Sequence, residues 1–242
     1  MEEQNYTHSY MSELRKRIIA VAIFFILALA IGMLFSKKLV VMFLNSNLPL
    51  NVNLVTLNPY ENISLFIHFT FFVAIALTFP FVIYQALMYI KPSLTRNEKK
   101  LAIIVPFIAL LLFSLGAGFG FLITKQIIVP FLSKLTLNIG IVNNWSINQF
   151  MMFVVYLSLA MGLIFQLPLL VSLLVKFNIL RPGQLKKMRK HTIIGLLVLA
   201  ALITPPDLFS LIIMVIPLIL LFELTIFIAK FMKRDKIEGV AV

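Results

Sequence analysis

The segment TIIGLLVLAALITPPD (192–207) decides the fold of this chain, because its apolar part fits two different topologies. The chain has 242 residues, of which 61% are hydrophobic, and its mean hydropathy is +1.04. A soluble core does not absorb so much apolar surface, so the composition indicates a polytopic membrane protein. Residues 192–203 are few for a membrane-spanning helix, which needs about 20 residues. They fit either a short crossing helix or a re-entrant segment.

Six apolar segments along the chain predict an all-α membrane protein with six transmembrane helices in a single polytopic membrane domain. The predicted spans cover residues 18–36, 63–90, 101–124, 149–175, 192–204 and 210–230. The second span is longer than a hydrocarbon core of about 30 Å requires, so we expect it to tilt, or to bend at Pro80. The first span is expected to be retained, because no small-residue cleavage site follows it.

The basic residues alternate between the two sides of this arrangement. Of the 21 Lys and Arg residues, 17 lie before the first span, between the second and third, between the fourth and fifth, or at the end of the sixth. The positive-inside rule therefore places both termini in the cytoplasm. A five-span chain would put a basic loop or the basic tail outside, so the charges favour a crossing by 192–204. The net charge of +12 is then mostly a topology signal, with some attraction to anionic lipid, and predicts no nucleic-acid partner.

The two long outer segments, 37–62 and 125–148, differ from ordinary short turns. They contain prolines and the single tryptophan, and they alternate apolar with small polar residues. Proline limits the length of any helix in them. We expect these segments to form a folded outer cap with short interfacial helices.

The sequence lacks the patterns of catalytic and metal sites. It has no cysteine and only three histidines, His8, His68 and His191, without the spacing of metal ligands. Neither a phosphate-binding GxxxxGK[ST] loop nor a GxSxG serine motif is present. We therefore expect no cofactor, no metal and no enzymatic activity. The alternative function is a secondary transporter, which predicts an internal repeat and several polar residues near the membrane midplane; the sequence has few such residues and no obvious repeat.

Polar residues inside the predicted spans are candidates for function, because an ionisable group at the membrane centre costs roughly 3 kcal/mol or more. Glu223 lies within the sixth span and Gln166 near the middle of the fourth. Each fits either a functional site or a hydrogen bond that holds two helices together, and for Gln166 the second role is favoured. Asp207 follows Pro205 and Pro206 at the outer turn, where it fits an N-cap of the sixth helix.

Six motifs, in order along the chain, resemble those of the TatC family. They are SELRKR (12–17), NPYE (58–61), FPFVIYQALMYIKPSLTRNEKKL (79–101), FQLP (165–168), ITPPDLFS (203–210) and IPLILLFE (216–223). TatC is the signal-receptor subunit of the twin-arginine (Tat) protein translocase. The resemblance covers residues 8–232, and it implies a cupped bundle of six helices with an outer cap and short fifth and sixth helices.

The resemblance also implies a function and a location. Proteins of this family bind folded precursors through an Arg-Arg signal peptide, then recruit single-span TatA-type subunits for export driven by the proton-motive force. The expected partners are these signal peptides, TatA-type and TatB-type subunits, other TatC copies and membrane lipid. The expected location is the cell membrane of a prokaryote.

Glu13 and Glu98 match the two family acids that contact the twin arginines, and the match makes Arg15 a candidate for ordering this site. From the local sequence, Arg15 and Arg17 fit topology anchors instead. A carboxylate suits the role, because it accepts both arms of the planar guanidinium fork. The local sequence offers other roles. Thr95 and Glu98 form a capping box in front of the third span, and Glu13 has the i,i+4 spacing to pair with Arg17.

Three positions depart from the common family pattern. Tyr10 stands where the family usually has His, Gln166 where many members have Glu, and Leu211 where many have Gln. A role of residue 166 that needs a charge is therefore not expected, whereas a polar contact with a signal peptide or a TatA-type helix is retained. A polar docking contact at 211 is expected to be lost or moved.

Overall fold

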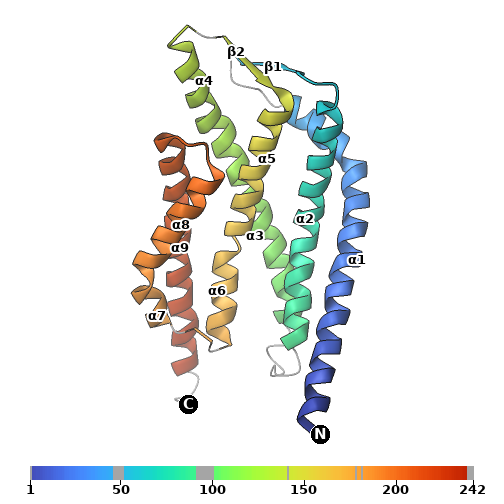
Figure 1. Ribbon diagram of the computed structural model, residues 1–242. Helices are drawn as coiled ribbons and strands as arrows, with labels where there is room; N and C mark the ends of the chain where they lie inside the picture. Colours follow the sequence, from blue (N-terminus) through green and yellow to red (C-terminus); the bar gives the residue numbers. More distant parts are fainter. Residues whose placement is uncertain are drawn as a thin grey trace.

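The computed structural model describes residues 2–45, 52–90, 101–140, 142–177, 179–180 and 182–238. Its elements are shown in Figure 1. In chain order they are α1 (Glu2–Asn45), β1 (Val52–Val55), α2 (Glu61–Ile90), α3 (Leu101–Ile123), the π-helix η3 (Thr124–Ile128), α4 (Val129–Leu137), β2 (Asn143–Ser146), α5 (Ile147–Ile164), α6 (Leu167–Lys176), α7 (Pro182–Lys187), α8 (Arg189–Ile203) and α9 (Leu208–Glu238).

The prediction of a helical membrane protein is confirmed. Five helical stretches are long and apolar enough to cross a membrane, namely Met11–Leu44, Glu61–Tyr89, Ile104–Leu137, Ile147–Lys176 and Leu208–Lys230. The sixth apolar helix, α8, has only 15 residues, fewer than the roughly 20 that an untilted crossing needs. The start of α1 and the end of α9 lie at the same end of the bundle (Figure 1), as an even number of crossings requires.

The last two helices differ from the pair of short helices that the resemblance implied. α9 is long, with 31 residues, and only α8 is short. The turn between α8 and α9 therefore lies well below the end of the bundle that carries β1 and β2 (Figure 1). Where the two membrane surfaces cross these helices stays a prediction.

The fourth predicted span, 149–175, is not one helix. It is divided into α5 and α6 at Phe165 and Gln166. The cause is Pro168, which has no amide hydrogen to donate to the preceding turn. The Gln166 amide donates to Leu163 O at 3.0 Å, which tightens the last turn of α5, and α6 restarts with Leu170 N donating to Gln166 O at 2.9 Å.

The cap contains two strands that the sequence analysis did not predict. β1 and β2 pair in parallel, with Val52 opposite Asn143 and Val55 opposite Ser146. Only part of the expected helical structure is present there, as α4, which continues α3 through η3. A four-residue strand has too little periodicity to be recognised, and its partner lies about 90 residues away along the chain.

One buried acid joins this cap to the bundle. Glu61, at the start of α2, is only 3% exposed. Ser146 Oγ donates to its Oε1 at 3.0 Å, and the Leu57 amide donates to its Oε2 at 3.2 Å. The same Ser146 oxygen accepts the Gln149 amide and so caps α5. A single carboxylate thus holds the starts of two helices and the end of β2 together.

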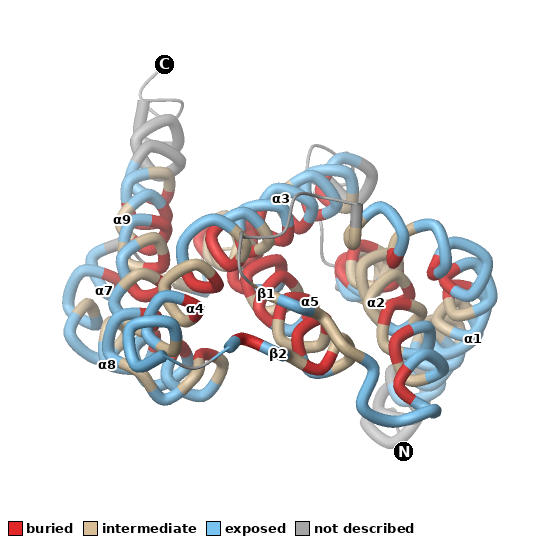
Figure 2. The backbone as a smooth tube through the Cα atoms, turned by 90° about the horizontal axis from the view of Figure 1, so that it is seen from above, coloured by how far each residue is buried: buried red, intermediate tan, exposed pale blue. Residues whose placement is uncertain are grey.

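The helices form a curved row rather than a closed cylinder. α1 packs against α2, α3 against α5, and α9 against α6 and α8. Seen from above, the row runs from α1 at one end to α8 and α9 at the other (Figure 2), which confirms the cupped bundle. α1 is strongly apolar, yet most of it is exposed, because only 11% of the residues in its most apolar stretch are buried. Such a surface suits contact with lipid.

A close approach of α3 and α5 depends on glycine. A Cβ atom on Gly116 would lie 2.7 Å from both the Met161 carbonyl oxygen and the Phe165 side chain, and one on Gly120 would lie 2.9 Å from Met161 Cβ. Small residues four positions apart share a helix face and let two membrane helices approach closely. Gly118, between them, faces open space, because a Cβ there would meet no atom within 4 Å.

We predict opposite effects of the same substitution at two of these glycines. Gly116→Ala forces α3 and α5 apart and should lower the free energy of unfolding by about 1–3 kcal/mol. Gly118→Ala should leave it unchanged or raise it by up to about 1 kcal/mol, because alanine favours the helix. Thermal unfolding in detergent, followed by circular dichroism, measures both. Equal melting temperatures for the two variants would contradict the assignment of Gly116 to the helix interface.

Candidate functional site

The first candidate site lies at the end of α1 near the N-terminus. Glu13 Oε1 accepts a hydrogen bond from Arg17 Nη2 at 2.5 Å, one helical turn further along. The Glu13 side chain is 38% exposed and the Arg17 side chain 19%. The i,i+4 pairing that the sequence offered for Glu13 is therefore present, and it leaves this carboxylate accessible from outside.

Arg17 does more than pair with Glu13. Its Nη1 donates to Gln85 Oε1 at 3.1 Å, and its Nη2 also donates to the Met88 carbonyl oxygen at 2.8 Å. Gln85 and Met88 belong to the last turns of α2, so one guanidinium fixes the end of α2 against α1. Residues 91–100 follow this anchored helix end in the sequence. Arginine suits the position because its rigid fork supplies several donors in fixed directions.

The other residues expected at this site are placed less closely. Arg15 is exposed, and it lies two positions from Glu13, so the two side chains leave α1 on different faces. Glu98 lies outside the described residues, as does Thr95 of the proposed capping box. The contacts of Glu13 with Arg17 and of Arg17 with α2 are therefore the described part of the site.

Gln166 is fully buried at the junction of α5 and α6. Its Nε2 donates to the Ala109 carbonyl oxygen of α3 at 3.1 Å and to the Gly162 carbonyl oxygen at 3.3 Å. The backbone N–H of Gln166 donates to Leu163 O instead of Gly162 O. The Gly162 carbonyl oxygen therefore lacks its regular helical donor, and the Gln166 side chain donates to it instead. The side chain therefore joins two helices and satisfies the backbone at the break.

Glu223 forms an ion pair rather than standing alone in its helix. Its Oε2 accepts a hydrogen bond from Arg189 Nη2 at 2.5 Å. Arg189 is the first residue of α8 and Glu223 lies at the middle of α9, so the pair joins the start of α8 to the middle of α9. Both side chains are partly exposed, which makes the pair a helix-to-helix contact at the edge of the bundle.

The outer turn between α8 and α9 is built by Asp207 and the two prolines before it. Asp207 Oδ1 accepts the Ser210 amide at 2.7 Å, which is the N-cap geometry that the sequence predicts. The Asp207 amide donates to Pro205 O at 2.7 Å, closing the turn. Pro205 is partly buried and Pro206 is exposed.

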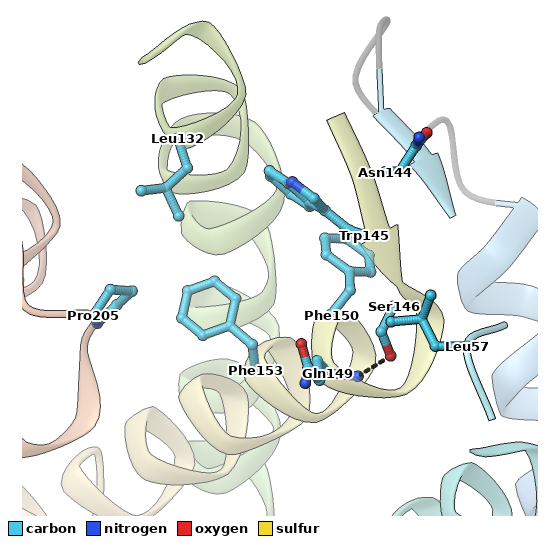
Figure 3. Close-up of a pocket in the computed structure, with 9 residues that line it drawn as sticks. All are labelled: Leu57, Leu132, Asn144, Trp145, Ser146, Gln149, Phe150, Phe153 and Pro205. Carbon is cyan, nitrogen blue, oxygen red and sulfur yellow. Dashed lines mark hydrogen bonds between the residues drawn. The ribbon is translucent and has the colours of Figure 1, made fainter. Parts of the chain in front are cut away.

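Pro205 also borders a cavity that the sequence gives no sign of. The cavity has a volume of about 310 Å³ and lies between the cap and the turn of α8 and α9. Its residues are drawn in Figure 3, where the aromatic rings of Trp145, Phe150 and Phe153 lie along it, opposite Pro205. It is open because the α8–α9 turn ends below the cap.

Three contacting residues were missed as site residues by the sequence analysis. Gln85 belongs to a quoted motif but has no charge, Arg189 was counted only among the basic loop residues, and Glu61 was not recognised as buried. Their partners lie 68, 34 and 85 residues away along the chain. Among the described residues no group of three or more His, Cys, Asp or Glu is placed to hold a metal ion.

Comparison with known proteins places the chain among protein translocase subunits. Residues 9–217 match the family model described as Sec-independent protein translocase protein (TatC). The chain is 31% identical over 221 residues to Sec-independent protein translocase protein TatCy of Bacillus subtilis, covering 91% of this chain and 87% of that one. It is 32% identical over 232 residues to TatC of Aquifex aeolicus, covering 95% and 96%. A crystal structure of the twin-arginine translocase receptor TatC superimposes with a TM-score of 0.75 at 31% identity, over 92% of this chain and 98% of that one.

We predict that the Gln166 amide stabilises the junction of α5 and α6. Gln166→Leu removes both donated hydrogen bonds and leaves the buried Gly162 carbonyl without its partner, so unfolding in detergent should become easier by about 1–3 kcal/mol. Gln166→Glu, protonated in this buried place, still donates one bond and should lose less stability. The melting temperatures of the two variants test this. A leucine variant as stable as the unaltered chain would show that the amide does not hold the helices together.

Proposed function

This chain belongs to the TatC family and is a receptor subunit of the twin-arginine translocase, and we propose that it binds the Arg-Arg signal peptides of folded precursor proteins through Glu13 and Glu98. The observation that carries the proposal is the state of Glu13. Its carboxylate is held in place by Arg17, yet more than a third of its side chain is exposed. A fixed and accessible acceptor is what recognition of a guanidinium requires.

The position of Glu98 in the chain supports a second contact at the same end. Residues 91–100 lie in the sequence between the end of α2 and the start of α3, and Arg17 anchors the end of α2 beside Glu13. Four Lys and Arg residues and one acid occur in this segment. The cations repel an incoming pair of arginines, so the local acids are needed to make binding favourable.

We further propose that both termini face the cytoplasm of a prokaryotic cell, with the chain in the cell membrane. The bias of 17 among 21 basic residues supports this orientation, and so does the placement of both helix ends on one side of the bundle (Figure 1). The signal peptide, still in the cytoplasm, then meets Glu13 and Glu98 directly.

The proposed protein partners are TatA-type and TatB-type single-span subunits and other copies of TatC, in export driven by the proton-motive force. Gln166 cannot serve as a docking contact in this arrangement, because it is fully buried and bonded to α3. A partner helix would have to open the junction of α5 and α6 to reach it. Contacts with a partner therefore fall to exposed side chains, such as those of the partly exposed pair of Glu223 with Arg189.

The alternative function, a secondary transporter, is not supported. A transporter would gather several polar residues around one site near the midplane. In the described part of the chain, Gln166 is enclosed between helices, and Glu223 pairs with Arg189 at a partly exposed edge of the bundle. The two residues belong to separate structural contacts.

We predict that an Arg-Arg signal peptide binds this chain in lipid nanodiscs, and that a Lys-Lys peptide binds at least about ten-fold more weakly, or 1.4 kcal/mol. Lysine carries the charge but cannot form the bidentate contact. Glu98→Gln and Glu13→Gln should each weaken the Arg-Arg peptide by a similar factor, because a neutral amide loses the charge-assisted bonds. Fluorescence anisotropy of a labelled peptide measures these affinities.

Glu223→Gln is the matched control, because it removes an acid of similar exposure at another place and should leave the affinity unchanged. Circular dichroism verifies that each variant is folded. Equal binding of both peptides to all folded variants would refute the site. In that case Glu98 and Glu13 have only structural roles.

A further inference from the structure

An apolar groove, here called the cap-side groove, opens between α1, α2, α3 and α5. It has a volume of about 350 Å³, within the range of about 300–1,000 Å³ that is usual for small-molecule sites. It does not overlap the proposed signal-peptide site. The residues that line it are Leu39, Met42, Phe43, Phe69, Phe72, Ala117, Gly118, Phe121, Val155 and Ser158.

The chemistry of the cap-side groove suits a hydrocarbon chain. Nine of the ten side-chain positions that line it are apolar, and the exception, Ser158, is buried. Gly118 faces open space within it, and Met42 at its edge is 70% exposed. A groove on the surface of a membrane protein opens to lipid, and an empty groove would forfeit dispersion contacts along its walls.

The height of the groove argues for an acyl chain rather than a partner helix. Its lining comes from residues 39–43, 69–72, 117–121 and 155–158, about one turn of each helix at roughly 5.4 Å per turn. A helix that packs along the bundle contacts its neighbours over several turns. A flexible chain fills a space one turn high, along the wall that Phe43 forms with Phe69 and Phe121, whose rings it contacts.

A cation stands at the groove. Lys125 Nζ lies 5.8 Å from the centre of the Phe121 ring, and Phe121 is one wall of the groove. Lys125 lies four residues after Phe121, toward the cap, at the end of the predicted third span. Neither of the two ion pairs found among the described residues involves Lys125. Its charge is therefore available to an anion.

The surrounding charges are complementary to an anionic headgroup. The outer segments 37–62 and 125–148 contain four lysines and a single acid, Glu61. Glu61 is buried and bonded to Ser146 and Leu57, so it offers no competing negative charge at the surface. Lys38, exposed next to Leu39, adds a second cation beside the groove. An uncharged partner would form no ion pair with these lysines.

The local backbone explains why Lys125 stands there. It lies in η3, the π-helical turn Thr124–Ile128, which precedes Pro130. Proline lacks the amide hydrogen for the regular helical ladder, and the chain widens into a π-turn, in which the Val129 amide donates to Thr124 O. Turns of this kind often occur at functional sites. The turn marks where α3 passes into α4, above the groove.

We propose that the cap-side groove binds an acyl chain of an anionic phospholipid, whose phosphate is held by Lys125. The lipid belongs to the leaflet on the cap side of the membrane. It lies beside the contact of Phe43 on α1 with Phe121 on α3, two helices that pack less extensively than α1 does with α2. The bound lipid thus completes a wall of the curved bundle.

Native mass spectrometry of the purified full chain with phosphatidylglycerol or phosphatidylcholine tests the proposal. The unaltered chain should retain phosphatidylglycerol at least ten-fold more tightly than phosphatidylcholine. Gly118→Leu should lower retention of both lipids at least ten-fold, because the side chain occupies the groove from a position where an added Cβ atom meets no protein atom within 4 Å. Lys125→Gln should abolish the preference for phosphatidylglycerol and leave the binding of phosphatidylcholine unchanged.

Two control substitutions match these variants. Gly195 on α8 also faces open space but lies outside the groove, so Gly195→Leu should bind lipid as the unaltered chain does. Lys134 on α4 is an exposed lysine of the same outer region, so Lys134→Gln should keep the lipid preference. If the control variants lose as much lipid as the groove variants, or if the unaltered chain shows no lipid preference, the proposal is wrong.

A photo-crosslinking residue at position 118, in membranes that contain the other translocase subunits, identifies the occupant directly. Crosslinks to phospholipid support the proposal. Crosslinks to a single-span subunit or to a second copy of this chain overturn it, because the groove is then a protein interface. The outcome is independent of signal-peptide binding, which occurs at the opposite end of the bundle.

Discussion

A polypeptide inside a membrane has no water to satisfy its backbone, and the structure depends on this constraint. The helices meet it with their own hydrogen bonds, and polar side chains meet it where a helix is interrupted. At the break before Pro168, the amide of Gln166 donates to Gly162 O and to Ala109 O of the neighbouring helix. At the start of α2, the carboxylate of Glu61 accepts the Leu57 amide. Gln166 and Glu61, both buried, therefore supply hydrogen bonds at places where the helical pattern stops.

Two arginine contacts each hold a pair of helices together. Arg17 joins α1 to α2 through Gln85 and Met88, and Arg189 joins α8 to α9 through Glu223. The acid proposed to read signal peptides belongs to the first pair. Its geometry is set by contacts that do not involve α8 or α9.

Part of the candidate site was accessible to sequence reasoning and part was not. The pairing of Glu13 with Arg17 follows from their i,i+4 spacing, and the capping role of Asp207 follows from its place after two prolines. The contacts of Arg17 with Gln85, and of Glu223 with Arg189, join residues 68 and 34 positions apart. No local pattern encodes such a distance. In the sequence, Glu223 stood out as an ionisable residue without a partner in its own predicted span. In the structure it pairs with Arg189.

The sequence by itself determined the apolar helices, the side of the membrane on which each loop is expected, and the motifs of the TatC family, because hydrophobicity and charge act residue by residue. Tertiary structure alone decided the pairing of β1 with β2, the replacement of a backbone donor by Gln166, and the contact of Gly116 with Met161. Each of these needs two distant segments at one place. Their energies arise from packing and hydrogen bonding between segments, and these interactions exist only once the chain is folded.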